Sequence, residues 1–375
     1  MRVVVAPDSF KGSLTAAAAC AAMETGVLRA VPGAEVARVP MADGGEGTLD
    51  CIGAATGGAE IRLDVGGPLG DPVTARYLLA ADASSAVVEL AAASGLPLVD
   101  PARLDPLRAD TEGTGRLIAD AIRRGARSVL VCVGGSASTD GGTGLLRALG
   151  VRFLDAAGAE LPPGGGSLAG LARVDFTRVP AEVRATRFDI ACDVTNPLIG
   201  PQGAAAVFGP QKGAGPADVR RLERGLVRLA DVLADQLGIA VHHLPGAGAA
   251  GGTCGGMLAV LDATAQPGCE LVARSVGLPD AMTGADLVLT GEGRLDRQSA
   301  DGKVVSHVAR LAAERGIPVV ALAGQVVPPL TTLYDLGLTA AFSIADGPRT
   351  LEAMTGSAAG LLAHAAEQTL RLRTG

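Results

Sequence analysis

The chain has 375 residues, of which 48% are hydrophobic but only 2% aromatic, so we expect two domains with cores of Ala, Val, Leu and Ile. The net charge of -7 gives no basic footprint for nucleic acid or an anionic membrane, so a small molecule is the expected ligand. Six scattered cysteines, together with the lack of a signal-peptide pattern and of a long apolar run, predict a cytoplasmic protein with reduced thiols.

Both ends of the chain alternate strand-like and helix-like patterns. Short apolar runs that end in polar or glycine-rich turns predict strands at 2–6, 35–40, 287–290, 318–323 and 340–345. Helical periodicity predicts helices at 14–31 and 304–315. These βαβ units indicate a doubly wound parallel α/β sheet with strand order 2-1-3-4-5, formed by residues 1–58 together with 268–375.

The middle of the chain has a different pattern. Strand-like runs at 61–65, 73–79 and 86–90 are separated by hairpin-turn sequences, and a helix at 114–124 and a strand at 128–133 follow. This succession predicts a second, mixed-sheet α/β domain at 59–267, inserted into the first.

Six predicted strand ends are rich in glycine and acidic residues. They read APDSFKGS, PMADGGEGT, CVGGSASTDGG, ACDVTNP, LTGEGRLD and IADGP. Glycine allows backbone amides to approach a phosphate, and carboxylates can hold Mg²⁺ or accept a proton from a hydroxyl group. Because phosphoryl transfer needs all of these groups, the strand ends predict a phosphotransferase.

Lysine is scarce in this chain. Only three of the 32 basic residues are lysines, namely Lys11, Lys212 and Lys303, and each lies in a glycine-containing segment. Asn196 is the single asparagine. Three solvated surface lysines would be the simplest explanation, but a compact ammonium cannot be replaced by the planar fork of arginine. We therefore expect all three lysines to contact phosphate or carboxylate in a cleft between the domains.

A nicotinamide-binding role is a weaker interpretation. Gly246, Gly248 and Gly251 spell GxGxxG, and Glu270 lies about twenty residues further on. However, the motif follows Pro245 and a poor strand pattern, and it lies inside the mixed-sheet domain.

Other nucleotide and metal motifs are not found. No P-loop occurs, because Lys303 and Lys212 are not followed by Ser or Thr. The adjacent His242 and His243 would point to opposite sides of a strand, which does not suit zinc.

Seven motifs taken in order resemble the bacterial glycerate kinase family of the glyoxylate and tartronate semialdehyde pathways. They are APDSFKGSL, ADGGEGT, GGSASTDGG, ACDVTNPLIGPQGA, FGPQKGA, PGAGAAGG and TGEGRLDRQSADGK, and they span nearly the whole chain. The resemblance implies ATP and D-glycerate as substrates, Mg²⁺ dependence, and 2-phosphoglycerate rather than 3-phosphoglycerate as product. It also implies a flavodoxin-like domain beside a restriction-enzyme-like domain, and a homodimer is the assembly to consider.

With this resemblance, the site residues are assigned as hypotheses. The catalytic candidates are Asp193, Lys11 and Lys212, with Asp193 as the base, although a capping or Asx-turn role for Asp193 stays open. The cofactor-binding candidates are Ser9, Gly12, Ser13, Gly134, Gly135, Ser136, Asn196, Gln211, Gly291 and Lys303. The metal-binding candidates are Asp43, Glu46, Glu292 and Asp296. The rival interpretations are a non-catalytic anion-binding protein and a nicotinamide-dependent oxidoreductase.

Overall fold

The computed structural model describes residues 1–45, 47–300 and 302–374. Its internal contacts divide the chain into two units. Unit 1 comprises Met1–Asp43, Asp50–Thr56 and Cys269–Gly375, and unit 2 comprises Gly44–Leu49 and Gly57–Gly268. Both units combine helices with sheets, so the fold is of the mixed α/β class.

Unit 1 contains a five-stranded sheet in the order β13-β12-β11-β1-β2, with all neighbours parallel. In the order along the chain this is 2-1-3-4-5, as expected from the sequence. The strands are β1 (Arg2–Val5), β2 (Glu35–Arg38), β11 (Leu287–Leu295), β12 (Val319–Val326) and β13 (Ala340–Ser343). The helices are α1 (Ala16–Ala30), α2 (Thr48–Thr56), α10 (Gly268–Ser275), α11 (Leu278–Ala281), η6 (Arg297–Ala300), α12 (Val304–Ala313), α13 (Thr331–Asp335) and α14 (Leu351–Thr374).

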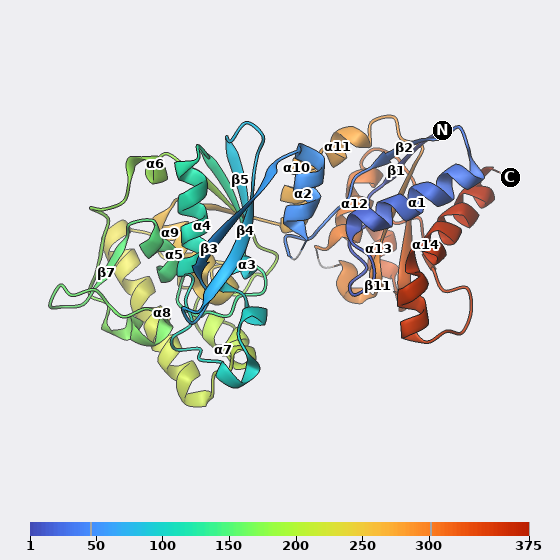
Figure 1. The fold of residues 1–375 in the computed structure, drawn as a ribbon. Helices are drawn as coiled ribbons and strands as arrows, with labels where there is room; N and C mark the ends of the chain where they lie inside the picture. Colours follow the sequence, from blue (N-terminus) through green and yellow to red (C-terminus); the bar gives the residue numbers. More distant parts are fainter. Residues whose placement is uncertain (46, 301, 375) are drawn as a thin grey trace. The chain divides into compact units, whose positions relative to one another are not determined.

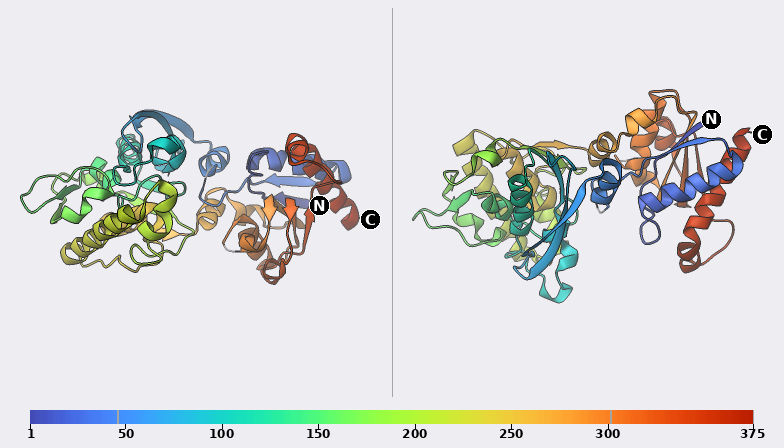
Figure 2. Two further views of the ribbon diagram at one scale, coloured as in Figure 1. Left: turned by 90° about the horizontal axis from the view of Figure 1, so that it is seen from below. Right: turned by 45° about the horizontal axis from the view of Figure 1, so that its top comes forward.

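Helices lie on either side of this sheet (Figure 2), and its central strands β1, β11 and β12 are largely buried, whereas the edge strands β2 and β13 are not. Helices α1 and α14 lie side by side (Figure 1), and Gly26 explains how closely they approach. A Cβ atom added to Gly26 would lie 2.0 Å from the carbonyl oxygen of Ala363 and 2.9 Å from Cβ of Ala366. Only glycine at this position allows the two backbones to touch.

Strand β11 is longer than the sequence indicates. The strand was expected to end at residue 290, but it continues to Leu295 because β12 pairs with it along its whole length, with Glu292 opposite Ala323 and Arg294 opposite Gln325. The expectation that Gly291 and Glu292 lie in a loop after the strand is therefore wrong. Gly291 suits this close pairing, because an added Cβ atom would lie 2.0 Å from the carbonyl oxygen of Leu322.

Unit 2 contains a six-stranded mixed sheet in the order β10-β9-β6-β5-β4-β3 and a two-stranded sheet of β7 and β8. The strands are β3 (Ala59–Gly66), β4 (Pro72–Leu79), β5 (Ser85–Glu89), β6 (Ser128–Cys132), β7 (Arg152–Leu154), β8 (Arg173–Asp175), β9 (Arg187–Ala191) and β10 (Thr264–Gln266). The helices are α3 (Ala91–Ser94), η1 (Leu96–Leu98), η2 (Pro101–Arg103), α4 (Glu112–Arg123), α5 (Thr143–Ala148), η3 (Gly165–Gly170), α6 (Ala181–Arg184), α7 (Ala204–Phe208), η4 (Pro210–Lys212), α8 (Pro216–Leu237), η5 (Ala249–Gly252) and α9 (Thr253–Val260).

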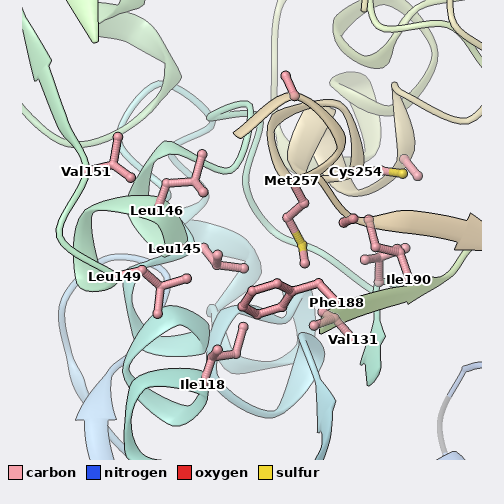
Figure 3. Packing of buried hydrophobic residues seen from close by; sticks show 14 of the residues in the cluster. Ile118, Val131, Leu145, Leu146, Leu149, Val151, Phe188, Ile190, Cys254 and Met257 are labelled. Carbon is pink, nitrogen blue, oxygen red and sulfur yellow. The ribbon is translucent and has the colours of Figure 1, made fainter. Parts of the chain in front are cut away.

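The pairing within this sheet changes direction at β5. Strands β3, β4 and β5 are joined as antiparallel neighbours, which confirms the two predicted hairpins, whereas β5, β6, β9 and β10 are parallel. Helices α4, α5 and α9 cover the sheet with aliphatic side chains. Figure 3 shows Phe188 among Ile118, Leu145 and Met257 in this buried core. The parallel half of the sheet brings the carboxyl ends of four strands to one edge.

Two further observations concern the chain as a whole. Among the described residues, no helix combines the length and the apolar character that a membrane crossing requires. None of the six cysteines, all of which lie among the described residues, forms a disulfide bond, and five of them are buried.

Candidate active site

A cavity of about 1070 Å³ lies in unit 1, at the carboxyl ends of β1, β11 and β12. Loops converge at this edge of a parallel sheet, which is where ligands bind in open α/β folds. The residues that line the cavity include Asp8, Ser9, Phe10, Lys11, Ser13, Asp43, Glu292, Gly293, Arg294, Asp296, Arg297, Lys303, Ile344, Arg349, Leu351, Met354 and Ala358. The cavity therefore combines acidic, basic and apolar side chains.

Three carboxylates interact electrostatically in this cavity. The pKa of Asp8 is raised to about 7 by burial and by the negative charges of Asp43 and Glu292. The pKa of Glu292 is also raised, mainly by burial, although Ser299 and Lys303 oppose this effect. The Oε1 atom of Glu292 is buried and has no hydrogen-bond partner among the described residues. The three carboxylates therefore repel one another, while basic side chains that line the same cavity, Lys11 and Lys303 among them, oppose that repulsion.

The turn that carries Lys11 is built from the end of β1. The backbone N–H of Asp8 donates to the carbonyl oxygen of Gly291 at 2.9 Å and so extends the pairing of β1 with β11. Phe10 is only 2% exposed and anchors the turn in the core of unit 1. Gly12 adopts a φ of 78°, which favours glycine, and allows the chain to turn back towards α1. Lys11 is thereby held at the cavity.

Asp296 is already engaged by its own loop. One carboxylate oxygen accepts a hydrogen bond from the backbone N–H of Gln298 at 2.9 Å, and the other accepts one from Nε of Arg294 at 2.9 Å. Asp296 lines the cavity, but its contacts are those of an acid that fixes a turn. Glu292 is the better placed of the two to meet a ligand.

Lys212 lies in unit 2, in an environment that the sequence does not indicate. It was expected to contact phosphate or carboxylate from a glycine-containing segment, but it ends the short helix η4 and is only 2% exposed. Its ammonium group donates to the carbonyl oxygen of Ser138 and lies 3.4 Å from Oγ of Ser136. Burial lowers the pKa of Lys212 to about 8, while the charge of Asp140 opposes that shift. Lys212 is therefore not a solvated surface lysine.

Asp140 is the centre of the same buried region. Its carboxylate is fully buried and accepts hydrogen bonds from the backbone N–H groups of Thr111, Gly142 and Gly144 and from the hydroxyl of Thr111. We refer to Lys212, Ser136, Ser138, Asp140 and Thr111 as the Lys212 cluster. Its polar side chains form hydrogen bonds with one another and with nearby backbone groups of unit 2, as buried polar groups generally must.

A second, smaller pocket of about 530 Å³ lies in unit 2. It is lined by Gly44, Gly45, Thr74, Ala75, Arg76, Glu89, Ala91, Ala92, Pro97, Cys132, Gly134 and Gly135. Glu89 and Cys132 end the parallel strands β5 and β6, so this pocket also lies at carboxyl strand ends. Gly134 and Gly135 were predicted as cofactor ligands, and they contribute to this pocket instead of the cavity of unit 1.

The remaining predicted residues of unit 2 follow β9 along the chain. Asp193 is exposed, and its Oδ1 atom accepts a hydrogen bond from the backbone N–H of Gly268 at 2.8 Å, at the start of α10. Asn196 donates from Nδ2 to the carbonyl oxygen of Gln202 at 2.8 Å and so fixes its own loop. Gln211 is exposed in η4.

The GxGxxG segment has a packing role in the structure. An added Cβ atom would lie 2.2 Å from the carbonyl oxygen of Pro197 at Gly248, and 2.0 Å from that of Ser138 at Gly251. The segment leads into the short helix η5 and does not follow a strand of the parallel sheet. These glycines therefore allow backbone segments of unit 2 to touch, which does not fit a dinucleotide fingerprint.

The predicted residues are thus divided between the two units. The cavity of unit 1 gathers Ser9, Lys11, Ser13, Asp43, Glu292, Asp296 and Lys303, whereas Gly12 and Gly291 support it without lining it. Glu46 lies outside the described residues. Asp8 was missed, although it lies within the quoted segment APDSFKGS. Its position directly after a buried strand, at the edge where ligands bind, was the signal that could have identified it.

A parallel α/β sheet whose carboxyl edge gathers acids of raised pKa beside lysines is typical of enzymes that bind phosphates together with a divalent cation. The comparisons with known proteins identify the family. The model of the glycerate kinase family matches residues 3–374. A glycerate kinase from Halalkalibacterium halodurans is 43% identical over 97% of this chain and 96% of its own length.

Two further relatives agree with this assignment. The glycerate 2-kinase of Escherichia coli K12 is 42% identical over 94% of this chain and 92% of its own length. The crystal structure of a protein named as glycerate kinase 2 from Salmonella typhimurium LT2 covers 100% of this chain and 98% of its own, with 41% identity and a TM-score of 0.92. The chain belongs to the glycerate kinase family and is a kinase.

Proposed function

We propose that this protein transfers the γ-phosphoryl group of ATP to D-glycerate, with 2-phosphoglycerate as the favoured product. The observation that carries the proposal is the cavity of unit 1, in which carboxylates with raised pKa values lie beside Lys11 and Lys303. The name of the Escherichia coli relative, glycerate 2-kinase, supports the choice of the 2-hydroxyl group. We also propose that residues 1–58 and 268–375 form a flavodoxin-like domain and that residues 59–267 form a restriction-enzyme-like domain. Phosphoryl transfer would take place in a cleft between these two domains.

The composition of the cavity supports a nucleotide as its ligand. Ile344, Leu351, Met354 and Ala358 offer apolar surface on which a purine base can lie. Lys11 and Lys303 offer ammonium groups to phosphate oxygens, and Ser9 and Ser13 offer hydroxyl groups. A volume of about 1070 Å³ is large enough for a nucleoside triphosphate.

The residues of the cavity also fit a magnesium ion. No group of three or more His, Cys, Asp or Glu side chains in the described part of the chain forms a metal cage. Mg²⁺ does not need one, because it binds through one or two carboxylates together with phosphate oxygens and water. Glu292, whose buried Oε1 atom has no partner among the described residues, and Asp43, whose negative charge acts on Glu292, would hold the ion. A bound Mg²⁺ would neutralise phosphate charge as it develops.

The remaining roles concern the acceptor. Asp193 is proposed as the base that takes the proton of the attacking hydroxyl group, and its hydrogen bond with Gly268 would orient the carboxylate for this task. Lys212 is proposed to act by positioning, because its ammonium group is bound to Ser138 within the segment that follows Gly134 and Gly135. ATP hydrolysis is avoided when the site excludes water during transfer. A cytoplasmic location stays a prediction from the sequence.

The experiment that tests this proposal uses the purified protein with ATP, Mg²⁺ and D-glycerate, and identifies the product by ³¹P NMR. We expect ADP and 2-phosphoglycerate to appear together, and only when all three components are present. A lack of turnover across a panel of hydroxy acids would overturn the proposal. Reduction of a nicotinamide cofactor in the same assay would support an oxidoreductase instead.

A further inference from the structure

Two of the six cysteines are in contact inside unit 2. Cys192 follows β9 directly, and Cys254 lies in the first turn of α9, where Figure 3 shows it in the same buried core as Ile190 of β9. The thiol of Cys254 donates a hydrogen bond to the sulfur atom of Cys192. We propose that peroxide converts this contact into a reversible disulfide bond, and that the disulfide lowers the turnover of the enzyme. The disulfide itself is independent of the proposed function, whereas its effect on turnover rests on that function.

The backbone of residues 246 and 247 holds the two cysteines in place. The Sγ atom of Cys192 lies 3.8 Å from the carbonyl oxygen of Gly246, and a Cβ atom added to Gly246 would lie 3.4 Å from that sulfur. The carbonyl oxygen of Ala247 accepts a hydrogen bond at 3.0 Å from the backbone N–H of Gly255, the residue that follows Cys254. One short segment thus contacts Cys192 and the first turn of α9, so the packing of the fold keeps both cysteines together.

The two cysteines differ as a peroxide-sensitive pair requires. Cys192 is half-buried, whereas the other five cysteines are buried and Cys254 is 0% exposed. The hydrogen bond from Cys254 lowers the pKa of Cys192, although burial opposes this effect. The same hydrogen bond, together with burial, raises the pKa of Cys254. Because the thiolate is the form that reacts with peroxide, we expect Cys192 to be attacked first and Cys254 to complete the disulfide.

The oxidation proceeds in two balanced steps. The thiolate sulfur of Cys192 attacks one oxygen atom of hydrogen peroxide, the O–O bond breaks, and a sulfenic acid and a hydroxide ion form. The sulfur of Cys254 then attacks the sulfenic sulfur, the S–O bond breaks, and a second hydroxide ion leaves. The two thiol protons convert both hydroxide ions to water. The thiols are thereby oxidised by two electrons, and one peroxide is reduced to two water molecules.

The disulfide affects the site because Asp193 follows Cys192 directly. The backbone N–H of Cys192 donates to the carbonyl oxygen of Gln266 at 3.0 Å, and Oδ1 of Asp193 accepts a hydrogen bond from the backbone N–H of Gly268 at 2.8 Å. These bonds fix both residues against the end of β10 and the segment after it. A covalent bond holds two sulfur atoms closer than a hydrogen bond does, so oxidation draws Cys192 and α9 together. We expect Asp193 to be displaced with Cys192.

The chain provides a matched control for Cys254. Cys20 is 1% exposed and lies in unit 1, so C20A and C254A each remove one buried sulfur atom, but only C254A removes the partner of Cys192. After treatment with hydrogen peroxide, non-reducing peptide mapping by mass spectrometry should find the disulfide between Cys192 and Cys254 in the wild-type protein and in C20A. The C254A variant should accumulate sulfinic acid at Cys192 instead, because the resolving thiol is missing.

Turnover of D-glycerate measures the effect on the site. The kcat of the wild-type protein and of C20A should fall by about 100-fold as the disulfide forms, which is the loss expected when the proposed base moves by about 1 Å. Dithiothreitol should restore kcat in both, because thiol exchange reduces a disulfide. In C254A any loss should persist, because thiols do not reduce a sulfinic acid. If thermal unfolding shows that C254A is destabilised relative to C20A, C254S takes its place, since serine keeps a hydrogen-bond donor.

Each contrary outcome has a defined meaning. The inference is overturned if peptide mapping finds no disulfide between Cys192 and Cys254 in the oxidised wild-type protein. It is also overturned if the disulfide forms while kcat stays constant, or if C254A loses and regains activity as the wild-type protein does. If the untreated wild-type protein does not phosphorylate D-glycerate, the proposed function fails and the effect on turnover fails with it. Peptide mapping still decides whether the disulfide forms.

Discussion

The cavity of unit 1 and the Lys212 cluster of unit 2 both contain lysine and acidic side chains, but these side chains differ in how well their charges and hydrogen bonds are satisfied. In the cavity, Asp8, Asp43 and Glu292 repel one another, and the buried Oε1 atom of Glu292 lacks a partner among the described residues. In the cluster, Asp140 accepts four hydrogen bonds and Lys212 donates to Ser138. We infer that buried polar groups without hydrogen-bond partners are available to bind a ligand, whereas buried polar groups with such partners stabilise the fold. Substitutions should therefore cost activity in the cavity and stability in the cluster.

The largest effect is expected for Glu292→Gln. Activity should fall by about 100- to 1000-fold, equivalent to about 3–4 kcal/mol of transition-state stabilisation, if Glu292 holds the metal ion at the phosphates. The free energy of unfolding should stay constant or rise, because the variant removes a buried charge whose pKa is raised. Steady-state kinetics and urea unfolding measure the two quantities. Glu352→Gln, on the exposed face of α14, is the control and should change neither quantity. Normal turnover by the Glu292 variant would contradict a role of the cavity carboxylates in ligand binding.

The next effect concerns the close contact of the GxGxxG segment with the cluster. Gly251→Ala should lower the free energy of unfolding by about 3 kcal/mol or more, because its φ of 64° is unfavourable for alanine and its Cβ atom would lie 2.0 Å from the carbonyl oxygen of Ser138. Gly238→Ala is the matched control, since its φ of 73° is similar but nothing lies within 4 Å. It should cost only about 1 kcal/mol. Equal losses in urea unfolding would contradict the steric explanation.

A smaller effect is expected for Lys212→Arg. The guanidinium group is larger than the ammonium group it replaces in a site that is 2% exposed, so overpacking should lower the free energy of unfolding by about 2 kcal/mol. The equivalent change of an exposed side chain, Lys11→Arg, should leave stability unchanged. If Lys212→Arg reduces kcat without any loss of stability, Lys212 acts on the phosphate directly and does not belong with the satisfied groups.

The smallest effect is a slope of stability with pH. The pKa of Asp8 is near 7 in the folded protein and near 3.8 in the unfolded chain, so the folded state binds more protons between these values. Stability from this group should therefore be present at pH 4 and decrease as the pH rises towards 7, with a slope of at most about 1.4 kcal/mol per pH unit. Asp8→Asn should remove this decrease in urea unfolding measured at several pH values. Asp82→Asn, an exposed acid whose pKa is lowered, should not remove it.

The sequence predicted much of the fold because its signals are local. Apolar runs located the five strands of unit 1 and strands β3 to β6 of unit 2, and the two hairpins of unit 2 followed from their turn sequences. Strands β9 and β10 were not predicted. The end of β11 was predicted too early, because Gly291 and Gly293 disfavour a strand and only pairing with β12 extends it. Long-range pairing of this kind leaves no local signal.

The candidate site was predicted in part for a similar reason. The scarcity of lysine in the sequence identified Lys11 and Lys303 as candidates, and both line one cavity. It could not show that Lys212 is buried against Ser138. Residue type does not report burial. Asp8 was missed because its raised pKa arises from burial in the fold and from the charges of Asp43 and Glu292, which are distant in the sequence.

The position of β1 in the sheet of unit 1 has a consequence during synthesis. Strand β1 pairs with β11, and the hydroxyl of Thr290 donates to the carbonyl oxygen of Ala6 across 284 residues of chain. A ribosome that adds roughly 5–20 residues per second needs about 15–60 s to produce that span. Unit 2 can therefore fold first. Until β11 has been synthesised, the edge of the apolar strand Arg2–Val5 that pairs with it stays unpaired. Slow translation should thus favour aggregation through this strand, and chaperones that bind short apolar segments should suppress it.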